Sequence, residues 1–254
     1  MDSTPTVATA QFQPVIGAVE TNVSRMDRLL AKVPDADLVV FPELAVTGYD
    51  LEEAVPRASP VPGPLTDPLV DLASAHDVAL VAGLPERTDD ALYNALVYVD
   101  RDEVRATYRK QYPWGDERSV FDTGSGPVTV DTELGRVGFL VCYDLNFPEA
   151  SLAYVRRGVD LLVVSAAWRT EFRRDWRLLL RARALDGTWY AVGSNHVGDQ
   201  SGREHAGTSL VAGPDGSLLE AADDRPGVVA HEIDDEVLRA ARDRNPVRDA
   251  RRGR

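Results

Sequence analysis

Short apolar runs rich in β-branched residues recur along the chain, and they constrain its fold more than any other feature. Runs of this length are typical of core strands. They cover residues 7–12, 38–41, 79–83, 92–99, 137–141, 160–166, 190–194, 209–211 and 228–233. Helical patterns lie between several of them, at 22–33, 68–76, 149–157 and 171–185. Strands that alternate with helices early and follow one another closely later predict mixed sheets in a single α/β domain, residues 1–254.

The only cysteine, Cys142, lies where the predicted strand 137–141 gives way to a helix. Asn146 and Glu149 form a capping-box pattern, which predicts the start of that helix. A thiol just before a helix N-terminus feels the positive end of the helix dipole. We therefore expect a lowered pKa for Cys142 and a reactive thiolate. The alternative is a small buried hydrophobic side chain.

Lysine is scarce in this chain, which has 26 Arg but only two Lys, Lys32 and Lys110. Lysine is a compact charge with a tunable pKa, whereas the guanidinium of arginine is broad and stays protonated. A retained lysine can therefore mark a site that arginine would not fit. Lys32 lies near the end of a predicted helix, where simple solvation explains it. Lys110 follows a strand-like run and is the better candidate for a functional site.

An acidic residue, Glu43, follows the predicted strand 38–41. Pro42 ends that strand because it removes a backbone donor. Open α/β sheets bind their ligands at the carboxyl ends of strands, which makes Glu43 a candidate site residue. The alternative is a solvated or capping acid.

These three candidates lie in short motifs that resemble the catalytic motifs of the nitrilase superfamily of carbon-nitrogen hydrolases, in the same chain order. The motifs are Phe41-Pro-Glu-Leu44, Tyr108-Arg-Lys110 and Cys142-Tyr-Asp-Leu-Asn-Phe-Pro-Glu149. The resemblance covers about residues 5–234 and leaves a polar C-terminal tail, about 242–254, that we expect to fray. It implies an α-β-β-α sandwich, with two mixed central sheets flanked by helices on their outer faces.

The resemblance also implies a role for each candidate. Cys142 would attack the carbonyl carbon of an amide and form a thioester acyl-enzyme. Glu43 would be the general base, and Lys110 would stabilise the oxyanion together with the backbone N–H of Tyr143. We expect no cofactor and no metal.

Five further residues are candidates for the site. Glu117 lies where family members carry a second glutamate, which implies that it positions the substrate and orients Lys110. The alternative for Glu117 is an exposed acid in the charged run 116–118. The other four are aromatic residues that would form pocket walls, although each could equally be an ordinary core residue: Tyr49, Trp114, Tyr143 and Trp168.

The residues after the cysteine narrow the substrate. Superfamily members that hydrolyse nitriles usually have Trp-Glu there, whereas this chain has Tyr143-Asp144 followed by Phe-Pro-Glu. This resembles the amidase-type branches, so we predict hydrolysis of a small linear carboxamide to an acid and ammonia. N-carbamoyl or nitrile hydrolysis by the same residues is the alternative. A catalytically silent scaffold is a second alternative. The presence of all three catalytic candidates, Glu43, Lys110 and Cys142, disfavours it.

The net charge of the chain indicates which kinds of partner it can bind. The chain has 28 basic and 41 acidic residues, a net charge of −13, which disfavours nucleic acid despite the arginines from Arg169 to Arg183. Local salt bridges or a subunit interface explain those arginines better. The resemblance implies a homodimer or higher homo-oligomer through helices near this segment, with Trp176 as an interface anchor.

Metal binding and a membrane location are both disfavoured. The four histidines lack the spacing of a metal motif, although His196 and His205 could approach each other through a loop. The N-terminus has no secretory pattern, and no apolar run is long enough to cross a membrane. We therefore expect a cytoplasmic protein, and a single cysteine suits that reducing compartment.

Overall fold

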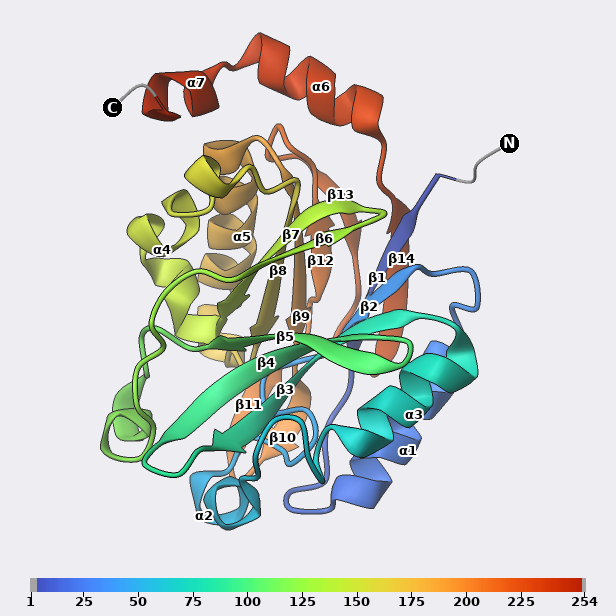
Figure 1. Cartoon of the computed structure of the whole chain (residues 1–254), viewed down its shortest axis with the longest axis vertical. Helices are drawn as coiled ribbons and strands as arrows, with labels where there is room; N and C mark the ends of the chain where they lie inside the picture. Colours follow the sequence, from blue (N-terminus) through green and yellow to red (C-terminus); the bar gives the residue numbers. More distant parts are fainter. Residues whose placement is uncertain (1–3, 253–254) are drawn as a thin grey trace.

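The computed structural model describes residues 4–252 and has two six-stranded sheets at its centre (Figure 1). The first sheet has the strand order β14 (Gly227–Glu232), β1 (Thr6–Gln11), β2 (Leu38–Val40), β3 (Ala79–Arg87), β4 (Leu92–Asp100) and β5 (Glu103–Arg109). The second has the order β13 (Leu218–Ala221), β12 (Leu210–Ala212), β9 (Tyr190–Asn195), β8 (Leu161–Ala166), β7 (Gly135–Val141) and β6 (Thr129–Thr132). A separate hairpin joins β10 (Val197–Gln200) to β11 (Arg203–Ala206).

Both sheets are mixed, as the sequence predicts. In the first sheet, β1, β2 and β3 run parallel, and in the second, β7, β8 and β9 do so. The remaining strand pairs are antiparallel. β2 and β7 lie in the two different sheets, and because these sheets pack face to face, the loops that follow the two strands can carry side chains to one place.

Helices cover the outer face of each sheet (Figure 1). Helices α1 (Val19–Leu30) and α3 (Asp67–His76) pack their apolar faces on the first sheet. Helices α4 (Pro148–Leu152) and α5 (Arg173–Gly187) cover the second. The predicted α-β-β-α sandwich is therefore confirmed. The other helices are α2 (Leu51–Ala54), α6 (Asp235–Arg244), α7 (Val247–Arg252) and the 3-10 helices η1 (Val55–Arg57), η2 (Gly115–Ser119), η3 (Cys142–Asn146), η4 (Val155–Arg157) and η5 (Thr170–Phe172).

The two sheets approach closely enough for direct hydrogen bonds between them. The Ser165 hydroxyl on β8 donates to the carbonyl oxygen of Phe41, just after β2, at 2.7 Å. The Thr9 hydroxyl on β1 donates to the Gly193 carbonyl oxygen at 3.0 Å. Both buried hydroxyls thus find their hydrogen-bond partners in the facing sheet.

Some predicted elements differ from those observed. The predicted helix 149–157 is two short pieces, α4 and η4, with a break between them. The strands β6, β10, β11 and β13 are missing from the prediction because each has only four residues and no unbroken apolar run over its length. Strands of this kind are defined by pairing with a neighbour rather than by their own sequence.

The prediction of a frayed tail at 242–254 is wrong for the residues that the structure describes, which end at Arg252. Helix α6 begins at an Asp234 cap, and its Arg242 forms an ion pair of 2.7 Å with Asp160. Arg248 on α7 is only 6% exposed. Charged residues form helices here because partners in the folded body neutralise them.

The prediction that Trp176 anchors a subunit interface is also wrong. Its side chain is fully buried within the chain, and its Nε1 donates to the carbonyl oxygen of Thr208 at 2.9 Å. Trp176 is therefore a core residue, although the helix that carries it is rich in arginine. A homodimer through this helix stays a prediction.

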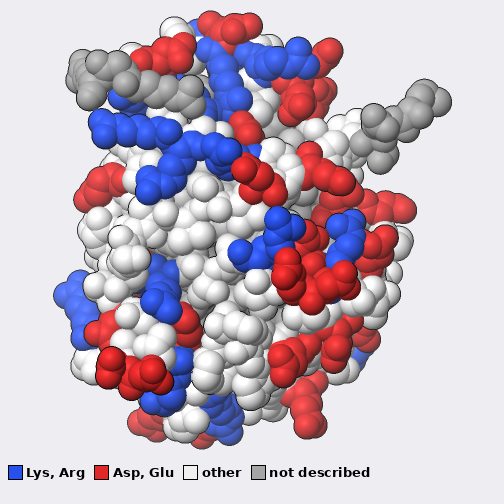
Figure 2. All heavy atoms as spheres, in the orientation of Figure 1, with Lys and Arg blue, Asp and Glu red and all other residues white. Residues whose placement is uncertain are grey.

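Charged side chains of both signs share the surface. Figure 2 shows basic side chains beside Asp and Glu over one face. Arg109 pairs with Glu86 at 2.7 Å and Arg136 with Asp131 at 2.6 Å. Within residues 4–252, no helix is long and apolar enough to cross a membrane.

Candidate active site

The loops that follow three strands carry the three triad candidates. Glu43 follows β2, Lys110 follows β5, and Cys142 begins η3 directly after β7. Glu117 comes from η2, a short turn beyond Lys110. The side chains of Glu43, Lys110 and Glu117 are each at most 1% exposed, so the reading of Glu117 as an exposed loop acid is wrong.

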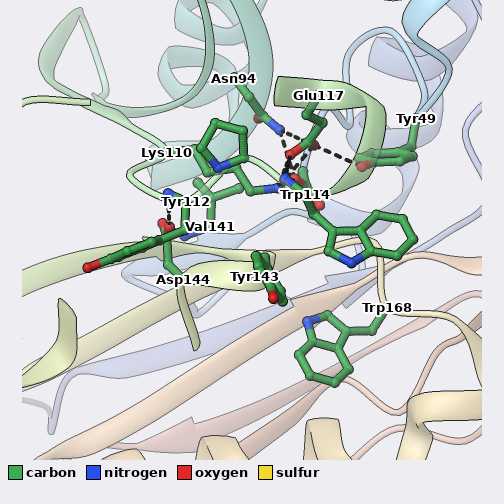
Figure 3. A network of polar contacts seen from close by, with 12 residues as sticks. Tyr49, Asn94, Lys110, Tyr112, Trp114, Glu117, Val141, Tyr143, Asp144 and Trp168 are labelled. Atoms are coloured by element: carbon green, nitrogen blue, oxygen red, sulfur yellow. Dashed lines mark hydrogen bonds and ion pairs between the residues drawn. The ribbon is translucent and has the colours of Figure 1, made fainter. Parts of the chain in front are cut away.

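Lys110 lies between two carboxylates (Figure 3). Its Nζ is 2.7 Å from Glu43 Oε1 and 2.7 Å from Glu117 Oε2. Asn94 donates from its Nδ2 to both acids, at 2.7 Å to Glu43 and 3.1 Å to Glu117. Lys110 therefore holds both acids in fixed positions, and the cluster keeps one negative charge in excess when both acids are ionised.

The two acids differ in how readily they bind a proton. Burial raises the pKa of Glu43 to about 7, although the charge of Lys110 opposes the shift. Burial also disfavours the charge of Glu117, but Lys110, the Trp114 N–H and the Tyr49 hydroxyl outweigh it and lower the pKa. Glu43 is thus the acid that can exchange a proton near neutral pH, while Glu117 stays charged.

Glu43 also has an oxygen that is available to a new partner. Its Oε2 is buried and accepts no hydrogen bond from the described residues. The carboxyl lies close enough to Cys142 that the charge of Glu43 raises the pKa of the thiol. A base with one oxygen held and the other available is arranged to receive a proton from a neighbour.

Cys142 has a φ of 48°, in the left-handed region that residues other than glycine rarely adopt. Asp144, two residues further on, holds this turn. Its buried carboxylate accepts hydrogen bonds from the N–H of Val141 at 2.9 Å, the N–H of Tyr112 at 2.8 Å and the hydroxyl of Tyr108 at 2.7 Å. These hydrogen bonds therefore hold the strained backbone at Cys142, and with it the position of the sulfur.

The expected low pKa of Cys142 is wrong. Burial and the charge of Glu43 raise the pKa of the thiol, and Lys110 and the Ala167 backbone N–H only partly offset them. The predicted capping box is also absent, because Phe147, the residue before α4, provides no side-chain cap and Asn146 instead donates to the Tyr143 carbonyl oxygen. The sulfur lies in a 3-10 turn, whose short dipole is outweighed by burial. The thiol therefore needs a base.

Two glycines allow the chain to pack directly behind the cluster. A Cβ at Gly83 would lie 2.2 Å from the backbone nitrogen of Leu44, next to Glu43. A Cβ at Gly124 would lie 2.0 Å from the Arg109 carbonyl oxygen, next to Lys110. Both contacts are far below van der Waals distance, so a side chain at either position would displace a residue of the cluster.

A cavity of about 190 Å³ opens beside the sulfur of Cys142. The four predicted aromatic residues, Tyr49, Trp114, Tyr143 and Trp168, all lie in its lining. Tyr49 also donates to Glu117 at 2.8 Å, and this ties one wall to the charged cluster. The other lining residues lie outside the sequence prediction: Asn146, Ala167, Arg169, Phe172, Asp175, Arg203 and His205.

His196 and His205 do approach each other, with ring centroids 5.4 Å apart. His196 has other partners, however, since Nε2 contacts the Glu43 carbonyl oxygen and Nδ1 contacts Gln200. No group of three or more possible metal ligands occurs in the part of the chain that the structure describes. Sequence reasoning missed Asn94 and Gln200; a polar residue inside a buried apolar strand, as at Asn94, was the available signal.

Known proteins share both the sequence pattern and the fold. An (R)-stereoselective amidase from a Pseudomonas species is 33% identical over 230 residues, which cover 89% of this chain and 84% of that protein. A CN-hydrolase superfamily protein from Xanthomonas campestris, with an arsenic adduct in its active site, aligns with a TM-score of 0.90 at 25% identity, covering 97% of this chain and 96% of that one.

A third similar protein is a variant of the amidase from Nesterenkonia sp. AN1, in which acrylamide has added to the active-site cysteine. It aligns with a TM-score of 0.84 at 26% identity and covers 94% of this chain and 97% of that one. The family model for carbon-nitrogen hydrolases matches residues 6–243. This chain belongs to the carbon-nitrogen hydrolase family, within the nitrilase superfamily.

Proposed function

We propose that this chain hydrolyses a small linear carboxamide to a carboxylic acid and ammonia through a thioester on Cys142. The observation that carries the proposal is the position of Glu43. One of its oxygens is held by Lys110 at 2.7 Å, and the other is buried, available and close to the Cys142 thiol.

The first step would be attack by sulfur on the amide carbon. Glu43 takes the thiol proton as Sγ forms a bond to the carbonyl carbon, and the carbonyl oxygen becomes an oxyanion. Lys110 Nζ and the backbone N–H of Tyr143 would stabilise that charge. Tyr143 lies in the first turn of η3, where backbone N–H groups lack partners within the helix.

Breakdown of the intermediate would release ammonia. Glu43 returns the proton to the amide nitrogen as the C–N bond breaks, which leaves the acyl group on Cys142. A water molecule then loses a proton to Glu43 and attacks the thioester carbon. The C–S bond breaks, the acid departs, and the proton returns to the thiolate, so the cycle consumes one water.

Two observations support an amide over the alternatives. Tyr143-Asp144 follows the cysteine where nitrile-hydrolysing members usually have Trp-Glu. Similar proteins include amidases from Pseudomonas and Nesterenkonia. The intact cluster of Glu43, Lys110 and Cys142 disfavours the catalytically silent scaffold.

The test is an ammonia-release panel of aliphatic and aromatic amides, N-carbamoyl amino acids and nitriles, with mass spectrometry for an acyl adduct. The expected result is amide turnover, an adduct confined to Cys142, and neither in Cys142→Ala. Turnover of nitriles to acids, or of N-carbamoyl compounds alone, would overturn the amide assignment. No turnover and no adduct across the panel would support the scaffold.

A further inference from the structure

Two arginines line the cavity beside Cys142, and they come from different elements. Arg169 follows the end of β8, and Arg203 begins β11. Both are half-buried, and both lie on the wall with the aromatic residues rather than with the cluster around Lys110. The mechanism proposed above uses neither of them.

Several half-buried arginines of this chain have close acidic partners, whereas these two do not. Arg109 and Arg136 each form a close ion pair with an acid. Among the described residues, the Arg203 guanidinium has no hydrogen-bond or ion-pair partner. Arg169 stacks over the ring of Trp114, 4.7 Å from its centroid, and within residues 4–252 the one acid that it pairs with is Glu171 at 3.8 Å, beyond hydrogen-bond distance. Both therefore have donors available to a ligand.

A third donor in the same wall has no partner. Trp168 is only 8% exposed, and its Nε1 is buried without a hydrogen-bond acceptor among the described residues. Figure 3 shows its indole nitrogen on the side that faces Tyr143 and Trp114, which line the same cavity. A buried donor without an acceptor costs free energy unless a ligand supplies one.

The charges of the lining favour an anion. Asp175 is the one acid among the lining residues, so two arginines leave an excess of one positive charge there. The whole chain has a net charge of −13, so this wall is positive within an acidic molecule. An anionic group is therefore favoured at this wall rather than beside the cluster around Lys110, whose excess charge is negative, or over most of the acidic surface.

We propose that the substrate is a short amide with a carboxylate at the end away from the amide. The carboxylate binds to Arg203 and Arg169 and accepts a hydrogen bond from Trp168, while the amide carbon faces Cys142. This rests on the proposed amide hydrolysis and adds the substrate class: monoamides of short dicarboxylic acids.

The experiment compares two pairs of amides: succinamate and glutaramate, each against an uncharged isostere in which an isopropyl group replaces the carboxylate. The measured quantity is the ratio of kcat/KM for the acid to kcat/KM for its isostere. We expect a ratio above one for at least one pair. Arg203→Gln should lower that ratio roughly 10- to 100-fold, as expected for loss of a charge-assisted hydrogen bond, and Arg169→Gln should lower it in the same direction.

A matched control removes the same charge outside the cavity. Arg174 is exposed on α5 and absent from the lining, so Arg174→Gln should leave the ratio unchanged. Preference of the wild-type protein for both isosteres, or a ratio that Arg203→Gln leaves unchanged, would overturn the carboxylate assignment while amide hydrolysis stands. Failure to hydrolyse any of the four amides, together with the wider panel, would instead reject the proposed function.

Discussion

His196 hydrogen-bonds the backbone carbonyl oxygen of Glu43 through its Nε2 atom. Because burial lowers the pKa of His196 to about 3, the ring is neutral, and Nε2 must carry the hydrogen that the carbonyl oxygen accepts. Nδ1 is then the acceptor for Gln200 Nε2, at 2.8 Å. His196 thus fixes the backbone of the residue that we propose as the base.

Gln200 extends this support to the pocket wall. Its Oε1 accepts a hydrogen bond from the Tyr49 backbone N–H at 3.0 Å, and the Tyr49 hydroxyl donates to Glu117. Glu117 pairs with Lys110, which pairs with Glu43. The contacts form a closed ring, so the hairpin of β10 and β11 and the charged cluster hold each other in place.

We predict that Gln200→Met lowers kcat roughly tenfold to a hundredfold with little change in KM, because a displacement of the base by about 1 Å costs on that order. The rate should be divided by the concentration of reactive Cys142, which alkylation measures. A loss of folded protein then does not appear as a loss of kcat. His231→Phe is the control and should keep the wild-type rate, because the half-buried His231 ring contacts Glu220 at 3.6 Å and does not line the cavity. A wild-type kcat per reactive thiol in Gln200→Met would rule out this positioning role.

Lys110→Arg should leave a nearly inactive enzyme. The ammonium is 1% exposed between two carboxylates at 2.7 Å, and the broader guanidinium does not fit this position. Loss of one oxyanion donor typically costs about 3 kcal/mol of transition-state stabilisation, so we expect kcat to fall about 100- to 1,000-fold. Lys32→Arg, at the other lysine, is exposed and provides a matched control. Near-normal turnover of Lys110→Arg would refute the oxyanion role.

The rate should depend on pH through Glu43. A base must be deprotonated before it can take the thiol proton, and the pKa of Glu43 is about 7. We therefore expect kcat/KM to rise with pH and to reach half of its plateau near pH 7, as measured by initial rates of ammonia release. Glu43→Gln should lower kcat by about 10²- to 10⁴-fold and abolish this rise. A plateau that extends well below pH 6 would show that another group limits the rate.

The raised pKa of Glu43 also makes the stability of the fold depend on pH. The folded pKa of Glu43 lies above its ordinary value of 4.5, so between pH 4.5 and about 7 the folded state binds more protons than the unfolded state. The contribution of Glu43 to stability is therefore present below pH 4.5 and is lost as pH rises toward 7. Glu117 shifts the other way, since its pKa is lowered. In thermal melts across this window, Glu43→Gln should show less loss of Tm with rising pH than the wild-type protein.

Much of the fold could be predicted from the sequence, because the central strands are apolar on both faces. Strands such as β8, which is fully buried, are recognisable without knowledge of their neighbours. Polar edge strands such as β6 are not, because pairing with a neighbour defines them. Glu43, Lys110 and Cys142 could be predicted as site residues because each follows a strand. The packing of the two sheets brings the ends of these strands together.

The chemistry of the site was less accessible. The raised pKa of the Cys142 thiol depends on the burial of the sulfur and on Glu43, which is 99 residues away in the chain, and a local helix signal gives no information about either. Arg203 and His196 come from the hairpin region that the sequence prediction did not resolve. Tertiary contacts bring together the residues that hold a site in position, and local sequence patterns do not reveal these contacts.

Asp144→Asn should destabilise the fold and slow the reaction together. Both oxygens of Asp144 accept: Oδ2 from the Val141 N–H and the Tyr108 hydroxyl, and Oδ1 from the Gln111 and Tyr112 N–H groups. An asparagine amide would turn its own N–H₂ toward one pair of donors and leave them without an acceptor. Each buried donor left unpaired costs about 1–3 kcal/mol.

Urea unfolding and the alkylation rate of Cys142 measure the two effects separately. We expect a loss of about 2 kcal/mol or more in the free energy of unfolding, and slower alkylation because the left-handed turn at Cys142 relaxes away from Glu43. Tyr108→Phe removes one of the donors to Asp144, and the Gln111 Nε2 that it leaves without an acceptor is only half-buried and can bind water, so it should cost only about 1 kcal/mol. Asp131→Asn, on an exposed ion pair with Arg136, should change neither quantity. Wild-type stability together with wild-type alkylation in Asp144→Asn would show that the turn is held by the backbone alone.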